Sequence, residues 1–180
     1  MRQVFLDTET TGLSADEGHR IVEIACVEWL NAVPTGRLFH HFLDPQRDVP
    51  EEVTAIHGLS SEFLRGKPLF IDVAADLIEF VTGAEVVIHN APFDLAFLDK
   101  ELLWSGIQTP FAKLCAKVTD TLPVFRAQLA GQRCSLQALC DRYNVALQPG
   151  DRRHSALTDA KQLALLWSTT QPDQRIIAGS

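Results

Sequence analysis

The sequence predicts one α/β domain, built on a mixed sheet with helices on both faces. Three apolar, β-branched segments separated by turns fill the first third of the chain, which is typical of an antiparallel meander. After residue 70, segments with helical spacing alternate with short apolar strands, as in domains whose helices cover a sheet. The chain has 180 residues, 46% of them hydrophobic, which is enough to bury one core.

The meander is expected to hold three strands. Pro34 and Gly36 indicate that a hairpin turn over 31–36 joins the second strand to an antiparallel third. Gly18 lies in a polar stretch, 14–19, that we expect to be a loop. The expected strands are residues 2–8, which are apolar on both faces and therefore central, then 20–30 and 38–43.

The rest of the chain is expected to alternate helices with two more strands. Gly83 falls where a helix would end, Asn90 suits a helix N-cap, and Pro92 fits the first turn of the helix that follows. Ser135 is expected to cap another helix. The expected elements are a short helix at 51–56, a helix at 70–82, a buried strand at 85–90, a helix at 92–104, a strand passing into a helix at 116–122, and helices at 134–143 and 156–168. Residues 149–153 are expected to form a loop, and we expect one domain over 1–170 and a loose tail at 171–180.

The composition excludes some classes of function. A net charge of −7 argues against a protein that grips nucleic acid through a basic surface, but not against an enzyme that meets it through bound cations. No apolar run reaches the roughly 20 residues of a membrane helix, and the N-terminus does not read as a signal peptide. The four cysteines show no Cys-x-x-Cys spacing and are expected to be reduced thiols of a cytoplasmic protein.

Two acids, Asp7 and Glu9, stand in the stretch 4–13 with only Thr8 between them. Because side chains alternate along a strand, both carboxylates point the same way and lie about 6.7 Å apart along it. Like charges this close repel unless a proton, a basic side chain or a metal ion separates them. No Lys or Arg follows until Arg20. A metal site is one interpretation, and a strand end with solvated acids is the other.

The carboxyl ends of two expected strands carry further polar groups. Thr10, Thr11 and Gly12 follow the acids in a turn whose hydroxyl and backbone N–H groups suit a phosphate or a base. Asp94 stands in the first turn of the helix after strand 85–90. Ligands of open α/β sheets gather at such strand ends. The alternative for Asp94 is an acid placed there by the helix dipole.

His154 and Asp159 are five residues apart. On one helix they would lie about 140° apart around the axis, so a shared site requires His154 in the loop before the helix, which Ser155 can cap. Asp159 falls on the apolar line of Leu163 and Leu166. A carboxylate there is costly unless it is paired or bound to a metal, so a metal site and an ion pair with an Arg are the two interpretations.

Three stretches, DTETTGL at 7–13, HNAPFDLAFL at 89–98 and HSALTDA at 154–160, resemble in order the motifs of the DnaQ-like DEDDh family of 3′–5′ exonucleases. The intervening IHGLS, KVTDTL and SLQALCDRY also resemble that family, and the resemblance covers essentially residues 3–168. The resemblance implies a ribonuclease H-like fold with a mixed five-stranded sheet. A sister class has a tyrosine four residues before the last Asp, where this chain has Ser155, so the histidine class fits better.

The resemblance also implies the roles of individual residues. The general base would be His154. Four acids would bind two Mg²⁺ or Mn²⁺ ions, for which carboxylate ligands are suited, namely Asp7, Glu9, Asp94 and Asp159. Six residues would hold the terminal nucleotide: Thr10, Gly12, Leu13, Ile56, His57 and Phe93.

The activity that this implies is removal of nucleotides from the 3′ end of single-stranded or mispaired DNA. Within the family the motifs resemble the proofreading exonucleases of bacterial DNA polymerase III, which implies a polymerase catalytic subunit and a small accessory subunit as partners. Members that join the polymerase do so through a further C-terminal tail, and the chain continues for only about a dozen residues past its last expected helix. Both a piece of a longer chain and a naturally short relative fit this length. Two alternative functions stay open, an RNA-trimming exonuclease of the same fold and a non-catalytic module that binds nucleic acid or a polymerase.

Overall fold

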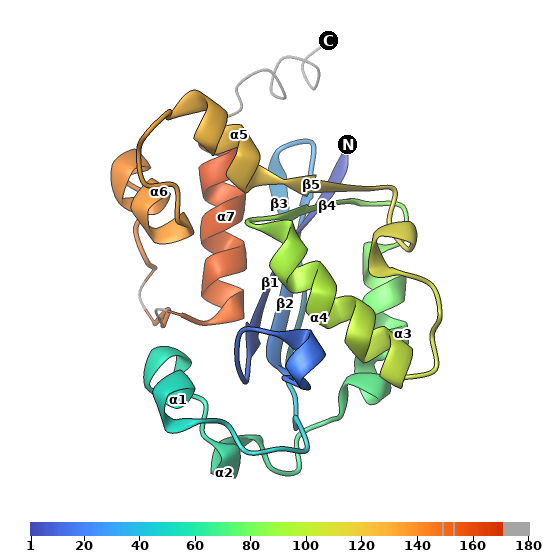
Figure 1. The fold of residues 1–180 in the computed structure, drawn as a ribbon. Helices are drawn as coiled ribbons and strands as arrows, with labels where there is room; N and C mark the ends of the chain where they lie inside the picture. Colours follow the sequence, from blue (N-terminus) through green and yellow to red (C-terminus); the bar gives the residue numbers. More distant parts are fainter. Residues whose placement is uncertain (149, 153, 171–180) are drawn as a thin grey trace.

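A computed structural model describes residues 1–148, 150–152 and 154–170. Its centre is a five-stranded mixed sheet in the order β3-β2-β1-β4-β5 (Figure 1). β1 pairs antiparallel with β2 and parallel with β4, so the expected central strand is confirmed. The strands are β1 (Arg2–Thr10), β2 (Ile21–Leu30), β3 (Val33–Phe42), β4 (Glu85–Ile88) and β5 (Lys117–Asp120).

Helices cover both faces of this sheet, as the sequence predicts (Figure 1). Within the described residues, no helix has the length and apolar character needed to cross a membrane. The α-helices are α1 (Glu51–His57), α2 (Ser61–Leu64), α3 (Phe70–Val81), α4 (Ala91–Trp104), α5 (Thr121–Gln128), α6 (Leu136–Tyr143) and α7 (Ala156–Thr170), and the 3₁₀ helices are η1 (Ala15–Glu17) and η2 (Phe111–Lys113). The short η1, α2 and η2 were not expected from the sequence.

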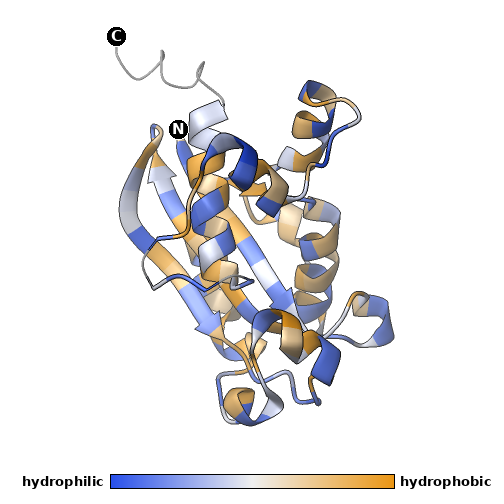
Figure 2. Ribbon diagram, turned by 90° about the vertical axis from the view of Figure 1, so that its left-hand side faces the viewer, coloured by the Kyte–Doolittle hydropathy of each residue, from blue (hydrophilic) through white to orange (hydrophobic). Residues whose placement is uncertain are grey.

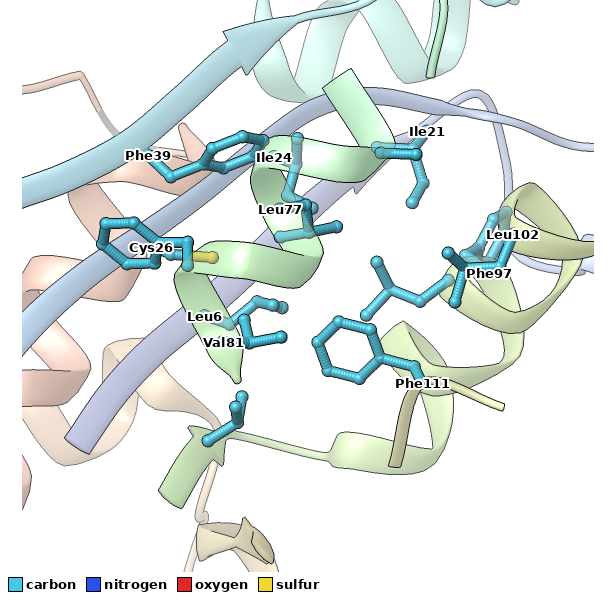
Figure 3. Close-up of a cluster of buried hydrophobic side chains, with 14 of the residues drawn as sticks. Leu6, Ile21, Ile24, Cys26, Phe39, Leu77, Val81, Phe97, Leu102 and Phe111 are labelled. Atoms are coloured by element: carbon cyan, nitrogen blue, oxygen red, sulfur yellow. The ribbon is translucent and has the colours of Figure 1, made fainter. Parts of the chain in front are cut away.

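Alternation along β1 divides the core into two layers. Val4 and Leu6 face α3 and α4 in one cluster, which Figure 3 shows with Leu6 beside Leu77 and Val81. Phe5 points to the other face and joins α5, α6 and α7. In Figure 2 the helices carry alternating hydrophobic and hydrophilic segments, as expected when one side of each helix packs on the sheet. The apolar side chains of β1 therefore pack alternately against helices on the two faces of the sheet.

Pairing direction decides where the strand ends meet. Because β1, β4 and β5 run parallel, their carboxyl ends lie at the same end of the sheet. The helices α4 and α5 start shortly after β4 and β5 end there. A smaller cluster of Val22, Val49, Leu59 and Leu64 holds the α1–α2 region against the start of β2. This arrangement places the end of β1 and the starts of α4 and α7 close together.

The structure corrects two local expectations. The β2–β3 turn consists of Asn31 and Ala32 alone, which both have positive φ, so Pro34 and Gly36 belong to β3 rather than to the turn. Positive φ at both central residues suits a tight hairpin. Asn90 precedes α4 but adopts a left-handed conformation and makes no side-chain capping bond. The cap by Ser135 is confirmed, and its hydroxyl accepts from the backbone N–H of Ala138.

Two positions of the loop expected at 149–153 and the whole tail expected at 171–180 lie outside the described residues.

Candidate active site

Three of the predicted site acids form a cluster at the end of β1. Asp7 and Glu9 project from the β1 face that packs on α7, and Asp159 stands in the first turn of α7. One carboxylate oxygen from each of the three lies within 4.8 Å of the others, and all three side chains are half-buried. The acids of β1 are therefore not merely solvated at a strand end.

Asp94 approaches the same region from the opposite face of the sheet. It lies in the first turn of α4, is 3% exposed, and accepts a 2.7 Å hydrogen bond from the hydroxyl of Thr8. Its oxygens do not belong to the cluster of Asp7, Glu9 and Asp159. Burial, and then the charge of Asp94, raise the pKa of Asp7 well above its ordinary range. Asp94 thus acts on the cluster electrostatically while Thr8 holds its carboxylate.

The electrostatics of the site are dominated by uncompensated negative charge. Burial, with the charges of Asp159 and Glu23 adding to it, raises the pKa of Glu9 to about 8. Burial raises the pKa of Asp94 to about 7 and that of Asp159 to about 6. In the described part of the chain, no Lys or Arg forms an ion pair with these acids, so the ion pair considered for Asp159 is not seen. Half-buried oxygen donors without a countercharge are a donor set that fits a hard divalent cation.

His154 lies in a bend before α7, as the spacing predicts. Its side chain is exposed, its φ is +52°, and its charge lowers the pKa of Asp159. A left-handed conformation is uncommon for a residue with a side chain and is characteristic of functional loops. Arg152, two residues earlier, lowers the pKa of Glu9, so the loop brings both basic groups toward the acids.

The turn after β1 holds three of the residues predicted to contact a nucleotide. The Thr10 hydroxyl donates a 2.6 Å hydrogen bond to the backbone carbonyl of Gly12. A Cβ at Gly12 would lie 2.3 Å from the His19 ring, so a larger residue here would displace that ring. Leu13 is 88% exposed, which leaves its apolar side chain free to contact a ligand.

The remaining predicted contacts come from α1 and α4. Ile56 is exposed, whereas His57 is buried beside the backbone of Thr10. His57 Nδ1 accepts from the backbone N–H of Leu59 at 3.0 Å. Burial lowers the pKa of His57, and the contact with the Thr10 backbone raises it, so the ring lies against the turn that follows β1.

A pocket of about 570 Å³ between η1 and α4 brings Leu13 and Phe93 together. The Phe93 ring lies 5.0 Å from that of Phe97, which supports it from behind. Lys100 and Asp99 also line the pocket. None of the four site acids lines this pocket, but its apolar side chains suit contact with an aromatic base.

The sequence around this site is similar to that of known nucleases. A protein-family model described as "Exonuclease" matches residues 4–167, which is most of the chain. The chain belongs to this exonuclease family. The acid cluster and the residues around it therefore lie within an exonuclease-family domain.

Curated relatives are more specific. The protein named "DNA polymerase III subunit epsilon" of Rickettsia conorii is 47% identical over 166 residues, covering 91% of this chain and 71% of the relative. The protein of the same name in Escherichia coli K12 is 44% identical over 169 residues, covering 91% of this chain and 68% of the relative.

Solved structures agree on the fold. The structure titled "Exonuclease X in complex with 5' overhanging duplex DNA" has a TM-score of 0.67 at 26% identity, covering 99% of this chain and 93% of that one. A structure of exonuclease I has a TM-score of 0.81 at 18% identity, covering 98% of this chain and 42% of that one, and it shows the shared fold alone. The ribonuclease H-like fold of this exonuclease is thereby confirmed.

Two charged residues near the acid cluster, Glu23 and Arg152, were not among the residues predicted from the sequence of this exonuclease. Glu23 lies on β2, directly across the β1–β2 pair from Glu9, and its side chain is fully buried. Its charge raises the pKa of Asp7, Glu9 and Asp159. The available signal was an acid in the middle of the apolar segment 20–30. Its partners are distant in sequence, so its neighbourhood could not be deduced.

Proposed function

We propose that this chain is a metal-dependent 3′–5′ exonuclease that releases nucleoside 5′-monophosphates from single-stranded or mispaired DNA 3′ ends. We further propose that it proofreads DNA replication as an epsilon-type subunit of DNA polymerase III. The observation that carries the proposal is the uncompensated cluster of Asp7, Glu9 and Asp159, with Asp94 beside it, in a chain 44–47% identical to epsilon subunits. Residues 1–170 would act as one exonuclease domain.

Two Mg²⁺ or Mn²⁺ ions would be held by Asp7, Glu9 and Asp159, with Asp94 completing the ligand set. Divalent cations bound there supply an activated water and stabilise the charge that develops on the departing 3′ oxygen. The chain itself contributes carboxyl groups held close together by β1 and α7. Because burial and mutual repulsion raise their pKa values, a bound cation would displace protons from these groups.

His154 would take the proton from the attacking water. An exposed imidazole beside the acids suits this role, since a histidine is the commonest general base near neutral pH. His154 lies close enough to Asp159 to lower the pKa of that carboxyl group. Proton transfer by a positioned side chain is worth about 10²–10⁴ in rate.

The terminal nucleotide would be held by the groups around this acid cluster. Leu13 and Phe93 present apolar surface to a base, and Ile56 adds an exposed apolar group from α1. The buried ring of His57 lies against the backbone of Thr10, where it would shape the nucleotide site. Stacking against such side chains tolerates any base, which a proofreading enzyme requires.

The proposed partners are a DNA 3′ end, the polymerase III catalytic subunit and a small accessory subunit, acting in the cytoplasm. The support is the printed name of the relatives, which places those proteins in DNA polymerase III. Co-purification with each candidate subunit would test this part separately from the chemistry.

Digestion of 5′-labelled oligonucleotides tests the proposed activity. With Mg²⁺ or Mn²⁺, we expect a ladder that shortens from the 3′ end, faster on single-stranded or mismatched termini than on paired ones, and no products in chelator. Matched DNA and RNA strands separate DNA proofreading from RNA trimming. Labelled oligonucleotides that stay at full length after incubation with either metal would instead favour a non-catalytic module that binds nucleic acid or a polymerase.

A further inference from the structure

Glu23 makes a set of contacts that the proposed chemistry does not use. It is fully buried, and its Oε1 accepts hydrogen bonds from His40 Nε2 at 2.8 Å and from the Ser155 hydroxyl at 2.9 Å. The backbone N–H of Ala156 also donates to it. One carboxylate of β2 therefore joins β3 to the residues at which α7 begins.

Ser155 is the residue through which Glu23 reaches the active site. It directly follows His154, and its backbone carbonyl accepts the N–H of Asp159 at 2.9 Å, in the first turn of α7. Among the described residues, no hydrogen bond holds the His154 side chain itself. The Ser155–Glu23 bond is thus the side-chain contact nearest to His154 that fixes this segment to the sheet.

An acid at position 23 is unfavourable for stability alone. Its charge acts on Asp7, Glu9 and Asp159, and its second oxygen, Oε2, is buried with no partner among the described residues. Although burial alone would raise the pKa of Glu23, the hydrogen bonds from His40 and Ser155 lower it, so the group is ionised. A buried ionised group that is repelled by neighbouring acids lowers stability, and such groups are typical of residues with a functional role.

We propose that Glu23 is a positioning residue that acts through Ser155 to hold His154 and Asp159 in register with Asp7 and Glu9. This inference rests on the proposed exonuclease function. Loss of the anchor would leave Asp7, Glu9 and the nucleotide contacts in place but would let His154 and Asp159 shift. Misplacement of a catalytic group by about 1 Å can cost up to 10²-fold in rate, so the effect belongs to kcat rather than to KM.

A matched pair of variants separates positioning from simple stability. Ser155→Ala removes the hydroxyl that donates to Glu23 and leaves the charge of Glu23 intact. Thr119→Val removes a hydroxyl that donates at 2.5 Å to another buried strand carboxylate, Glu85, at the amino end of β4. Both variants lose the same kind of bond, but only the first lies beside the candidate site. Ser155→Thr restores a hydroxyl at position 155.

The test is steady-state hydrolysis of a single-stranded oligonucleotide with Mn²⁺, alongside thermal melts, below the melting temperature of every variant. We expect Ser155→Ala to lower kcat about 10- to 100-fold with KM within about twofold of wild type. Ser155→Thr should recover most of kcat, and Thr119→Val should melt earlier with kcat unchanged. If Ser155→Ala does not fold, Ser155→Cys provides the same comparison, since a thiol is a much weaker donor.

The inference is overturned if a folded Ser155→Ala keeps kcat within twofold of wild type, or if KM rises while kcat stays constant. An equal loss of kcat in Thr119→Val would also overturn it. Failure of the proposed function looks different, because the wild-type protein itself would then show no metal-dependent hydrolysis.

Discussion

The two ends of strand β1 treat neighbouring buried carboxylates in opposite ways. At the amino end, Glu85 accepts hydrogen bonds from Lys117, Thr119 and Gln3 at 3.0, 2.5 and 3.0 Å. Burial alone would raise the pKa of Glu85, but these bonds lower it. At the carboxyl end, burial and mutual repulsion raise the pKa of Glu9 to about 8. One sheet therefore carries a buried acid with hydrogen-bonding and ion-pair partners at one end and, at the other, a cluster of acids without a basic partner among the described residues.

The difference shows what each end contributes to the molecule. A paired buried acid ties strands together, so the amino end serves stability. An unpaired acid cluster lowers the free energy of unfolding of the metal-free protein, and a bound cation raises it again. The carboxyl end therefore serves function. Substitutions at the two ends should accordingly fail in different assays.

Asp7→Ala should give the largest effect. Asp7 is central to the acid cluster, so we expect hydrolysis in Mg²⁺ to fall by about 10³-fold or more, comparable to the loss of a key electrostatic group. The fold should survive, because a repelling charge is removed. The matched control is Glu85→Gln, which should lower the melting temperature and leave the rate unchanged. More than a tenth of wild-type activity in Asp7→Ala would remove Asp7 from the metal site.

His154→Ala should have the next largest effect. We expect the rate to fall by about 10²–10⁴, the usual contribution of a general base. Mn²⁺ affinity, measured by titration calorimetry, should change little because His154 is not a proposed ligand. A mutant that keeps more than a tenth of the wild-type rate would exclude His154 as the base.

The acid pKa values predict how stability depends on pH without metal. Each raised carboxylate binds its proton more tightly in the folded state, with a folded pKa of about 6 for Asp159, 7 for Asp94 and 8 for Glu9. Their ordinary values are near 4. The folded state thus binds more protons between about pH 4 and pH 8, and the free energy of unfolding should fall as pH rises through that window.

Added Mn²⁺ should reverse this loss of stability. At a hundredfold excess over the dissociation constant, binding adds about 2.7 kcal/mol to the free energy of unfolding. Urea melts at pH 5, 7 and 8.5, with chelator and with Mn²⁺, measure both effects. A free energy of unfolding that rises with pH in chelator would contradict the account of the carboxyl end.

Asp94→Asn should have the smallest effect on the apo protein. The change removes one charge at nearly constant shape, and the amide oxygen can still accept from Thr8. In chelator the variant should melt at or above the wild-type temperature, whereas in Mn²⁺ it should gain less than wild type. A variant that melts far below wild type in chelator would show that Asp94 serves the helix rather than the cluster.

The sequence predicts this site better than it predicts what surrounds the site. Asp7, Glu9 and Thr8 are contiguous, so strand alternation alone places the two acids together, and the spacing of His154 and Asp159 requires the loop that is observed. Glu23 could not be found this way, because its partner Ser155 lies 132 residues away.

Local backbone choices were also hard to predict. Pro34 and Gly36 suggested a longer turn, but left-handed conformations at Asn31 and Ala32 close the hairpin, and β3 accommodates both residues. Asn90 precedes α4 in a left-handed conformation, with a φ of +67°, and makes no side-chain capping bond. Asparagine adopts this conformation more readily than most residues, so Asn31 and Asn90 suit these turns for a reason other than the one expected.

The central claim is that the carboxyl end of β1 holds protons that a divalent cation must displace. Titration calorimetry of Mn²⁺ binding, repeated in buffers of different ionisation enthalpy, measures the protons released. We expect a release of at least about one proton at pH 7, declining toward zero by pH 9 as Glu9 and Asp94 ionise unaided. Glu85→Gln should release the same number as wild type. Mn²⁺ binding without proton release at pH 7, or no binding at all, would contradict the account.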